Sequence, residues 1–284
     1  MSNTQKVSAN KAKEWNTFGH MWQKRKGSPL VPSPQALKLH ALNFRRAFGK
    51  RRGLHWLVLG ATPELRDLGL KLGCEVTFVD ANLDMILKMN QLVAVQNRTR
   101  EIMIKGNWLS VPLAHNYYHF VVSDVSLNNL DYKGMQKMVR VLHDLLLQEG
   151  HISLKEVMLS DGFECNTFKE NLSRYRRGNF ALNDFYLRAR FNTFWKQCYE
   201  KSTKRFAPGP VFDNFKCFYA EGVLSKKEFY DLYQFYNLIS HTILQKSELE
   251  KLLGRYFTIR GVSQTDSDTH DFYPMKIFFG KVKK

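Results

Sequence analysis

Cysteine is scarce in this sequence, and the cysteines present are widely separated. The 284 residues contain four of them, and no two have the C-x-x-C spacing of a zinc or redox site. The nine histidines are also scattered, without an H-E-x-x-H pair. The sequence therefore predicts neither a disulfide framework nor a metal site.

Long apolar runs are missing as well. No stretch approaches the ~18 residues that a membrane span needs, and residues 1–13 lack the apolar centre of a secretory signal. We therefore expect a cytoplasmic protein without a membrane partner. The chain is long enough for one large domain, or for a domain that carries an insertion.

Positive charge is abundant but unevenly distributed. The net charge is +17. Residues 1–52 hold 12 Lys and Arg against one acid, residues 53–160 hold 10 against 11, and residues 161–284 hold 21 against 14. A neutral centre with basic flanks fits an anionic substrate, a nucleic acid or simply a well-solvated surface.

The apolar run at residues 55–59 ends at Gly60, and a helix signal follows at once. Thr62 is placed to act as the N-cap, and Pro63 suits the first helical position, where its missing N–H costs nothing. Glu64 complements the positive end of the helix dipole. The segment predicts a strand, a tight turn and a helix.

A second apolar run, residues 76–79, ends in Asp80, twenty residues beyond Gly60. This spacing is typical of a nucleotide-binding βαβ unit, in which the acid binds a ribose diol. We therefore predict an adenosine pocket at the strand ends.

Alternating patterns continue along the chain and predict a parallel sheet of five strands. The further strands are expected at 101–105, 119–125 and from 150 onward. Helices are expected at 35–48, 83–93 and 132–148. Ser33 is the expected start of the first of these helices, and either Ala81 or Asn82 that of the second. Strands at 255–262 and 274–282 are joined by 11 residues, too few for a helical crossover, so they should form an antiparallel hairpin.

Residues 161–246 interrupt the alternation. Twenty Phe, Trp and Tyr lie between 161 and 245, and residues 168–205 hold ten Lys and Arg against three acids. We expect a helical, aromatic-rich and basic cap with its own small core, forming the substrate region.

The predicted domains are a basic helical arm (1–52), a core (53–160 and 247–284) and this cap. In the arm, Trp15 and Trp22 belong to a helix packed on the core or to a lid over the cofactor.

This order of elements resembles the class I S-adenosylmethionine-dependent methyltransferase family over about residues 54–160 and 247–282. The resemblance is carried by VLGATPELRDL, VTFVDANLDMI, GNWLSVPL and HFVVSDVSLNNL. It implies an α/β, Rossmann-like, seven-stranded and mostly parallel sheet with a C-terminal antiparallel hairpin, and S-adenosyl-L-methionine as the cofactor. Of the family's three glycines only Gly60 is present, with Thr62 and Glu64 at the other two positions.

Ligands bind outside the carboxyl ends of parallel strands, so the predicted pocket is built from the residues that follow four strands. Asp80 would accept hydrogen bonds from the ribose, or else cap a helix. Asn107 and Trp108 would flank the adenine, unless Trp108 is simply core. The resemblance places Asp124 and Val125 near the methionine end. The full predicted cofactor set is Gly60, Ala61, Thr62, Glu64, Asp80, Ala81, Asn82, Asn107, Trp108, Asp124, Val125 and Ser126.

A nicotinamide dehydrogenase is the rival interpretation at the level of fold. It needs a G-x-G-x-x-G turn for close approach of a pyrophosphate, and Glu64 would repel those phosphates. S-adenosylmethionine carries a sulfonium cation, which tolerates an acid at the turn.

Methyl transfer requires mainly that the acceptor is positioned in line with the methyl group, so a general base need not be visible in the sequence. His119 and His151 lie at the entering ends of their strands, and we reject them as bases. Candidates near the pocket are Asn128, Asn129, Lys155, Glu156 and, from the cap, Tyr175. Candidate substrate-binding residues are Arg174, Arg176 and Arg177.

The tip of the fourth strand, residues 123–126, lacks the Asp/Asn-Pro-Pro-aromatic sequence by which base-amino methyltransferases hold a planar amine. The favoured function is therefore methylation of an oxygen or nitrogen of a small metabolite, anionic or aromatic in character. Two alternatives stay open: a nucleic-acid methyltransferase that uses the basic arm and cap, and a noncatalytic module with the same fold.

Overall fold

The computed structural model describes residues 31–159, 166–179, 181–236, 239–265 and 275–283. The interpretation of Trp15 and Trp22 therefore concerns residues outside these ranges. Of the predicted arm, residues 31–52 are described.

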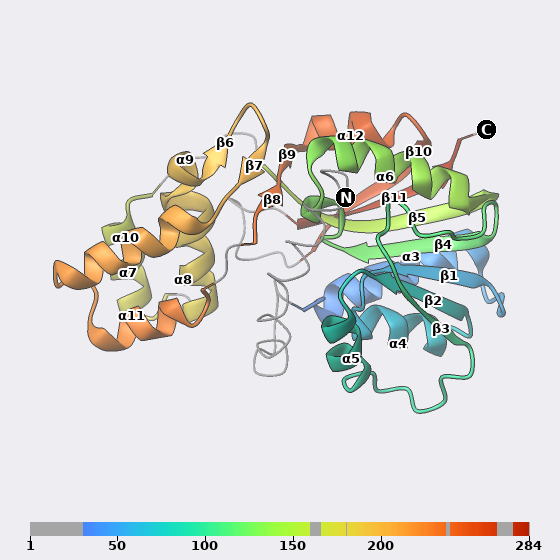
Figure 1. Cartoon of the computed structure of the whole chain (residues 1–284), viewed down its shortest axis with the longest axis horizontal. Helices are drawn as coiled ribbons and strands as arrows, with labels where there is room; N and C mark the ends of the chain where they lie inside the picture. The colour runs from blue at the N-terminus through green and yellow to red at the C-terminus, as the bar shows by residue number, and fades with distance from the viewer. Residues whose placement is uncertain (1–30, 160–165, 180, 237–238, 266–274, 284) are drawn as a thin grey trace.

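The centre of the protein is a sheet with the strand order β10-β11-β5-β4-β1-β2-β3 (Figure 1). The strands β1 to β5 pair in parallel, while β11 is antiparallel to both of its neighbours. The predicted seven-stranded, mostly parallel sheet with a terminal antiparallel hairpin is confirmed. The strands are β1 (His55–Leu59), β2 (Glu75–Asp80), β3 (Glu101–Lys105), β4 (Tyr118–Asp124), β5 (Leu146–Leu159), β10 (Phe257–Gln264) and β11 (Met275–Val282).

Helices cover both faces of this sheet (Figure 1). Successive strand residues point to opposite faces, so Leu57 packs in one buried cluster with the helices α6 and α12, whereas Trp56 packs in another with α3, α4 and α5. The helices are α3 (Pro34–Phe48), α4 (Pro63–Lys71), α5 (Leu83–Asn90), α6 (Tyr132–Leu145) and α12 (Lys246–Leu253).

Helix α3 is attached to the sheet by polar contacts as well as by its aromatic face. The Ser33 hydroxyl accepts a hydrogen bond from the Ala36 amide and caps the helix, as predicted. Ser153 Oγ of β5 lies 2.8 Å from His40 Nδ1 and accepts a bond from Asn43 at 3.1 Å. Burial lowers the pKa of His40 to about 3, with the charge of Lys155 adding to the effect, so the imidazole is neutral.

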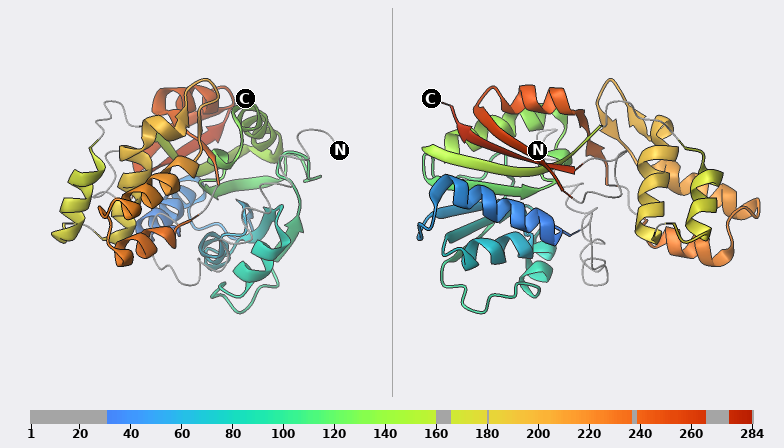
Figure 2. Two further views of the ribbon diagram at one scale, coloured as in Figure 1. Left: turned by 60° about the vertical axis from the view of Figure 1, so that its left-hand side comes forward. Right: turned by 180° about the vertical axis from the view of Figure 1, so that it is seen from behind.

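The chain leaves the sheet after β5 and forms a helical lobe, here residues 166–242 as far as they are described (Figure 2). Its aromatic cluster includes Phe185, Phe191 and Phe206 and continues onto Val157 of β5 and Met275 of β11. The predicted helical insertion after the fifth strand is therefore confirmed. Its elements are α7 (Phe168–Arg176), α8 (Leu182–Arg188), the π-helical turn η2 (Ala189–Thr193), α9 (Trp195–Cys198), β6 (Tyr199–Glu200), β7 (Arg205–Phe206), α10 (Gly209–Ala220), α11 (Lys226–Tyr233) and β8 (His241–Thr242).

Two details of the sequence interpretation were wrong. The cap is not only helical, because β6, β7 and β8 form a small antiparallel sheet and β9 (Leu244–Gln245) pairs with the end of β5. The helix expected at 132–148 ends at Leu145, and β5 begins at the next residue, where Leu146 pairs with Tyr118. No helix in the described ranges combines the length and apolar character that a bilayer span requires.

Candidate cofactor site

The turn between β1 and α4 brings a carboxylate and two backbone amides together. Gly60 has φ +100°, a conformation that other residues rarely adopt, and its amide donates to the Val79 carbonyl at 2.8 Å. The Asp80 carboxylate accepts from Ala61 N at 3.2 Å and from Asn82 N at 2.8 Å. The ends of β1 and β2 are thereby locked to one another.

Asp80 is a carboxylate in a desolvated position. Burial raises its pKa to about 6, although the backbone hydrogen bonds act in the opposite direction. No Lys, Arg or His of the described residues forms an ion pair with it. A carboxylate has about four acceptor positions, so Asp80 keeps capacity for donors from a ligand.

Trp108 lies over this turn. Its indole N–H donates to the Val79 carbonyl at 2.7 Å, and its ring edge lies 3.9 Å from the point where a Cβ on Gly60 would stand. With its donor occupied, the indole offers a ligand only apolar surface. Asn107 holds the same loop in shape, since its side-chain oxygen accepts from Leu109 N at 2.9 Å.

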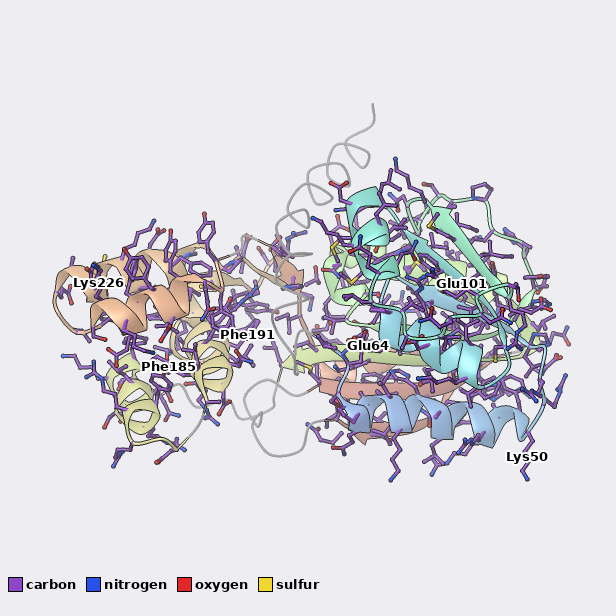
Figure 3. All side chains as sticks on the ribbon, turned by 90° about the horizontal axis from the view of Figure 1, so that it is seen from below. Lys50, Glu64, Glu101, Phe185, Phe191 and Lys226 are labelled. Atoms are coloured by element: carbon purple, nitrogen blue, oxygen red, sulfur yellow. The ribbon has the colours of Figure 1, made fainter. Side chains whose placement is uncertain are left out.

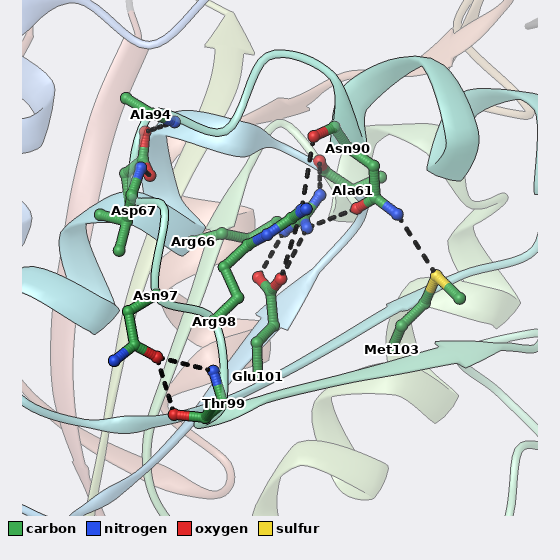
Figure 4. A network of polar contacts seen from close by, with 11 residues as sticks. Ala61, Arg66, Asp67, Asn90, Ala94, Asn97, Arg98, Thr99, Glu101 and Met103 are labelled. Atoms are coloured by element: carbon green, nitrogen blue, oxygen red, sulfur yellow. Dashed lines mark hydrogen bonds and ion pairs between the residues drawn. The ribbon is translucent and has the colours of Figure 1, made fainter.

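A buried arginine supports the turn from behind (Figure 4). Arg66 Nε and Nη2 donate to the two oxygens of Glu101 at 2.8 and 2.9 Å, and Nη2 also donates to Asn90 at 2.6 Å. Its Nη1 donates to the Ala61 carbonyl at 3.4 Å, and its guanidinium lies 3.8 Å from the centre of the Phe78 ring. Ala61 is thus held at both its N–H and its C=O. No sequence pattern predicted this network, because its members are separated by up to 35 positions in the chain.

The end of β4 and the neighbouring residue of β5 form a second buried charge pair. Lys155 Nζ lies 3.0 Å from Asp124 Oδ1, and the two side chains are 0% and 5% exposed. Asp124 was expected to pair with the ammonium of the cofactor or to orient the substrate, and here its cationic partner is Lys155. The next residue, Val125, has φ +61°, which is unusual and strained for a β-branched side chain.

The turn η1 (Leu127–Asn129), which follows β4, is organised by Glu156. This buried carboxyl group accepts from Ser123 Oγ and Leu127 N, both at 3.2 Å, and from Asn128 N at 3.3 Å. Burial raises the pKa of Glu156 to about 8. Its contacts are thus internal to the tip, which argues against a role as the general base.

The side-chain candidates for catalysis are mostly occupied elsewhere. The Asn128 amide bonds to both backbone groups of Val157 and to the Thr242 carbonyl. Asn129 donates to the Val125 carbonyl at 3.1 Å. Ser126, predicted as a cofactor-binding residue, donates to the Leu59 carbonyl at 2.9 Å. These contacts favour structural roles at the strand tips.

Other predicted residues lie as follows. Thr62 stands at the N-cap position of α4 but its side chain makes no capping bond, so that part of the prediction was wrong. Asn82 does cap α5, through a bond from Met85 N at 3.1 Å, and Ala81 beside it is exposed. Glu64 lies on the side of the sheet that faces the helical lobe (Figure 3).

The structure places the predicted cap residues away from the strand tips. Tyr175 stacks on Phe185 in the core of the helical lobe, with ring centres 4.8 Å apart. Arg176 makes two bonds to Glu228, at 2.7 and 2.8 Å, which tie α7 to α11. Arg174 is on α7 and Arg177 is the C-cap residue of that helix, and α8 lies between α7 and the sheet (Figures 1 and 2).

Of the two rejected histidines, His119 is partly exposed at the start of β4 and His151 is buried in β5. His119 Nδ1 accepts from the His55 amide at 3.1 Å, and His151 stacks on Phe279. Within the described ranges, no group of three or more His, Cys, Asp or Glu side chains is arranged to hold a metal ion.

The strand order, the antiparallel β11 between β5 and β10, and the acid at the end of β2 together define the class I S-adenosylmethionine-dependent methyltransferase fold. No family model and no curated protein sequence matches the chain.

Solved structures are similar to the chain at low identity. Magnesium protoporphyrin IX methyltransferase from Synechocystis, with bound S-adenosylhomocysteine, is 14% identical over 96% of this chain and 98% of its own, with a TM-score of 0.55. The 1,6-didemethyltoxoflavin-N1-methyltransferase of Burkholderia thailandensis is 11% identical over 100% of this chain and 92% of its own, with a TM-score of 0.58. A Rhodobacter sphaeroides protein named among the Zn-dependent alcohol dehydrogenases is 16% identical over 96% of this chain and 98% of its own, with a TM-score of 0.61.

Proposed function

We propose that the chain is an S-adenosylmethionine-dependent methyltransferase that modifies an oxygen or nitrogen of a small molecule. The observation that carries this proposal is Asp80. It is a partly exposed carboxylate without a cationic partner among the described residues, fixed by two backbone amides beside the Gly60 turn. Such a group is suited to accept hydrogen bonds from a ribose diol.

The remaining residues around the turn fit the same cofactor. Trp108 would flank the adenine through its apolar surface, with Asn107 shaping the loop. Asp124 and Val125 would lie at the methionine end. The proposed cofactor set is Gly60, Ala61, Thr62, Glu64, Asp80, Ala81, Asn82, Asn107, Trp108, Asp124, Val125 and Ser126.

The cofactor, when bound, supplies a methyl group already activated by its sulfonium. The chain then has to position the acceptor in line with that methyl group and to exclude water. The helical lobe would supply these functions; in support, its aromatic cluster includes Val157 of β5 and packs against Val125, which follows β4. The buried Asp124–Lys155 pair would hold the end of β4 in place beneath the acceptor.

A dehydrogenase is less consistent with these features. The dinucleotide fold has the parallel order 3-2-1-4-5-6 and a turn with three glycines. Here β11 is antiparallel and lies between β5 and β10, and only Gly60 of the three is present.

Calorimetry with the full chain tests the proposal. S-adenosylhomocysteine should bind with micromolar affinity or better, and NADH should give no heat. Binding of NADH without binding of S-adenosylhomocysteine would favour the dehydrogenase, and binding of neither would leave a noncatalytic module.

A further inference from the structure

Arg190 is a buried cation whose charge is not matched by an acid. It lies in the π-helical turn η2 and is 5% exposed. Its Nη1 donates to the Tyr186 hydroxyl at 3.0 Å and its Nη2 to the Ile239 carbonyl at 3.2 Å, while its Nε is buried without a hydrogen-bond partner. Within the described part of the chain, no Asp or Glu is close enough to form an ion pair with it.

Other arginines of the helical lobe differ in this respect. Arg176 pairs with Glu228 and Arg188 pairs with Asp184. Arg190 has instead the rings of Phe191 and Phe206, whose centres lie 4.9 and 5.4 Å from its guanidinium carbon. Cation–π attraction offsets only part of the cost of removing a guanidinium from water. The site is therefore electrostatically incomplete without an anion.

Arg190 lies where the helical lobe meets the strand tips. Ile239, which accepts its hydrogen bond, is three residues before Thr242, and the Thr242 carbonyl accepts from Asn128 at 2.7 Å. Val125 packs against the cluster that contains Phe191 and Phe206. In Figure 3, Phe191 lies on the side of the lobe turned toward the sheet, with Phe185 farther away.

We propose that Arg190 binds an anionic group of the methyl acceptor, a carboxylate or a phosphate. The inference rests on the proposed methyltransferase function and specifies its substrate class. A guanidinium presents paired N–H donors that match both groups, and its Nε edge is the part left without a partner. A π-helical turn is a frequent site of functional residues, because it reorients side chains that a regular helix would hold elsewhere.

Thermal unfolding of the full chain tests this assignment, with benzoate and inorganic phosphate as probes and sodium chloride to hold ionic strength constant. Melting is followed with and without S-adenosylhomocysteine. A ligand that binds only the folded state raises the melting temperature. We expect at least one probe to raise it by several degrees in the wild type; benzoate alone indicates a carboxylate on the acceptor, and phosphate alone a phosphate.

Arg190→Met should abolish this response, and Lys216→Met, which removes an exposed cation from α10 of the same lobe, should retain it. Arg190→Lys, which keeps the charge but loses the paired donors, is the second variant if Arg190→Met does not fold. It should weaken the affinity for the probe about tenfold and so reduce the rise in melting temperature. A purely structural arginine would lower the melting temperature of its variants without any anion response in the wild type. The proposal is overturned by a wild type insensitive to both probes, or by a folded Arg190→Met or Arg190→Lys variant that responds as strongly as the wild type. Because the response is also read without S-adenosylhomocysteine, failure to bind that ligand counts against the methyltransferase assignment alone.

Discussion

Asp80 combines two properties that a ribose-binding carboxylate needs. Its position is set by amides on both sides, from Ala61 and Asn82, so it does not have to be ordered when a ligand arrives. Its environment is desolvated enough to raise its pKa to about 6, so hydrogen bonds from a ligand are strong there. The contribution of this single side chain can be measured directly.

Asp80→Ala should weaken binding of S-adenosylhomocysteine by at least about tenfold, because it leaves two ribose hydroxyls without their acceptor. Calorimetry on the purified variant measures the loss. Asp84→Ala, an exposed acid in the first turn of α5, is the matched control and should bind like the wild type. An unchanged dissociation constant for Asp80→Ala would place the ribose elsewhere.

Cofactor affinity should also depend on pH through the same residue. The pKa of Asp80 in the free protein is raised to about 6, and hydroxyl donors from a ribose favour the ionised form. Below that pH the carboxyl group must lose a proton before it binds, so affinity should fall by about tenfold per pH unit. Above pH 7 it should be constant.

Calorimetric titrations between pH 5 and 8 (about the range over which this group changes charge) check the dependence. Asp80→Asn, which cannot titrate, should bind more weakly and show little change across the range. A wild-type affinity that is flat below pH 6 would mean that the carboxyl group does not contact the ligand.

Among the elements, α4 and β3 are joined beneath the cofactor turn by a charge pair. Arg66 is fully buried and the Glu101 side chain is 6% exposed, so neither is well solvated. Such a pair stabilises little compared with apolar residues, but each member needs the other. Arg66 also donates a hydrogen bond to the Ala61 carbonyl. This contact couples the stability of α4 to the geometry of the site.

Arg66→Met should lower the free energy of unfolding by about 3–5 kcal/mol, because it leaves the buried Glu101 carboxylate with only the part-exposed Arg98, 4.0 Å away, as a cationic partner among the described residues. Urea unfolding measures the change. In the double variant Arg66→Met, Glu101→Met, most of that loss should be recovered. Arg140→Met, which removes an exposed partner of Asp144, should cost about 0–1 kcal/mol. A similar small cost for Arg66→Met would contradict the proposed coupling.

Over the whole molecule, the exposed basic cluster of residues 50–52 and the proposed pocket lie at opposite ends of β1. The exposed residues Lys50, Arg51 and Arg52 come just before β1, whereas Gly60 comes just after it. The five residues of β1 separate them by roughly 17 Å, and Figure 3 shows Lys50 far from both Glu64 and the helical lobe. This arrangement favours a small acceptor that enters beside the lobe.

The double variant Lys50→Glu, Arg51→Glu should therefore leave methyl transfer to the acceptor unchanged, as well as binding of S-adenosylhomocysteine. Calorimetry measures the binding of S-adenosylhomocysteine, and activity assays with an identified acceptor measure methyl transfer. A nucleic-acid methyltransferase would behave differently: turnover would fall, and affinity for RNA would decrease steeply with salt. A large loss of turnover in this variant would support that alternative.

Much of the architecture follows from local sequence signals. The bounds of β1 and β3, the Ser33 cap and the terminal hairpin were all predicted correctly, because each depends on residues near one another in the chain. Of the two predicted starts of α5, Ala81 and Asn82, the cap is Asn82. The strands β6, β7 and β8 were missed since two-residue strands carry no periodicity.

The sequence by itself determined the order of the elements and the position of an acid after β2, since periodicity, caps and turns are properties of neighbouring residues. Only the tertiary structure decided which charges are buried and how they are matched. Arg66 meets Glu101 across 35 positions, Asp124 meets Lys155 on a paired strand, and Arg190 meets no acid among the described residues. The energy of a charge depends on its removal from water and on partners brought to it by packing, and neither is written in the residues beside it.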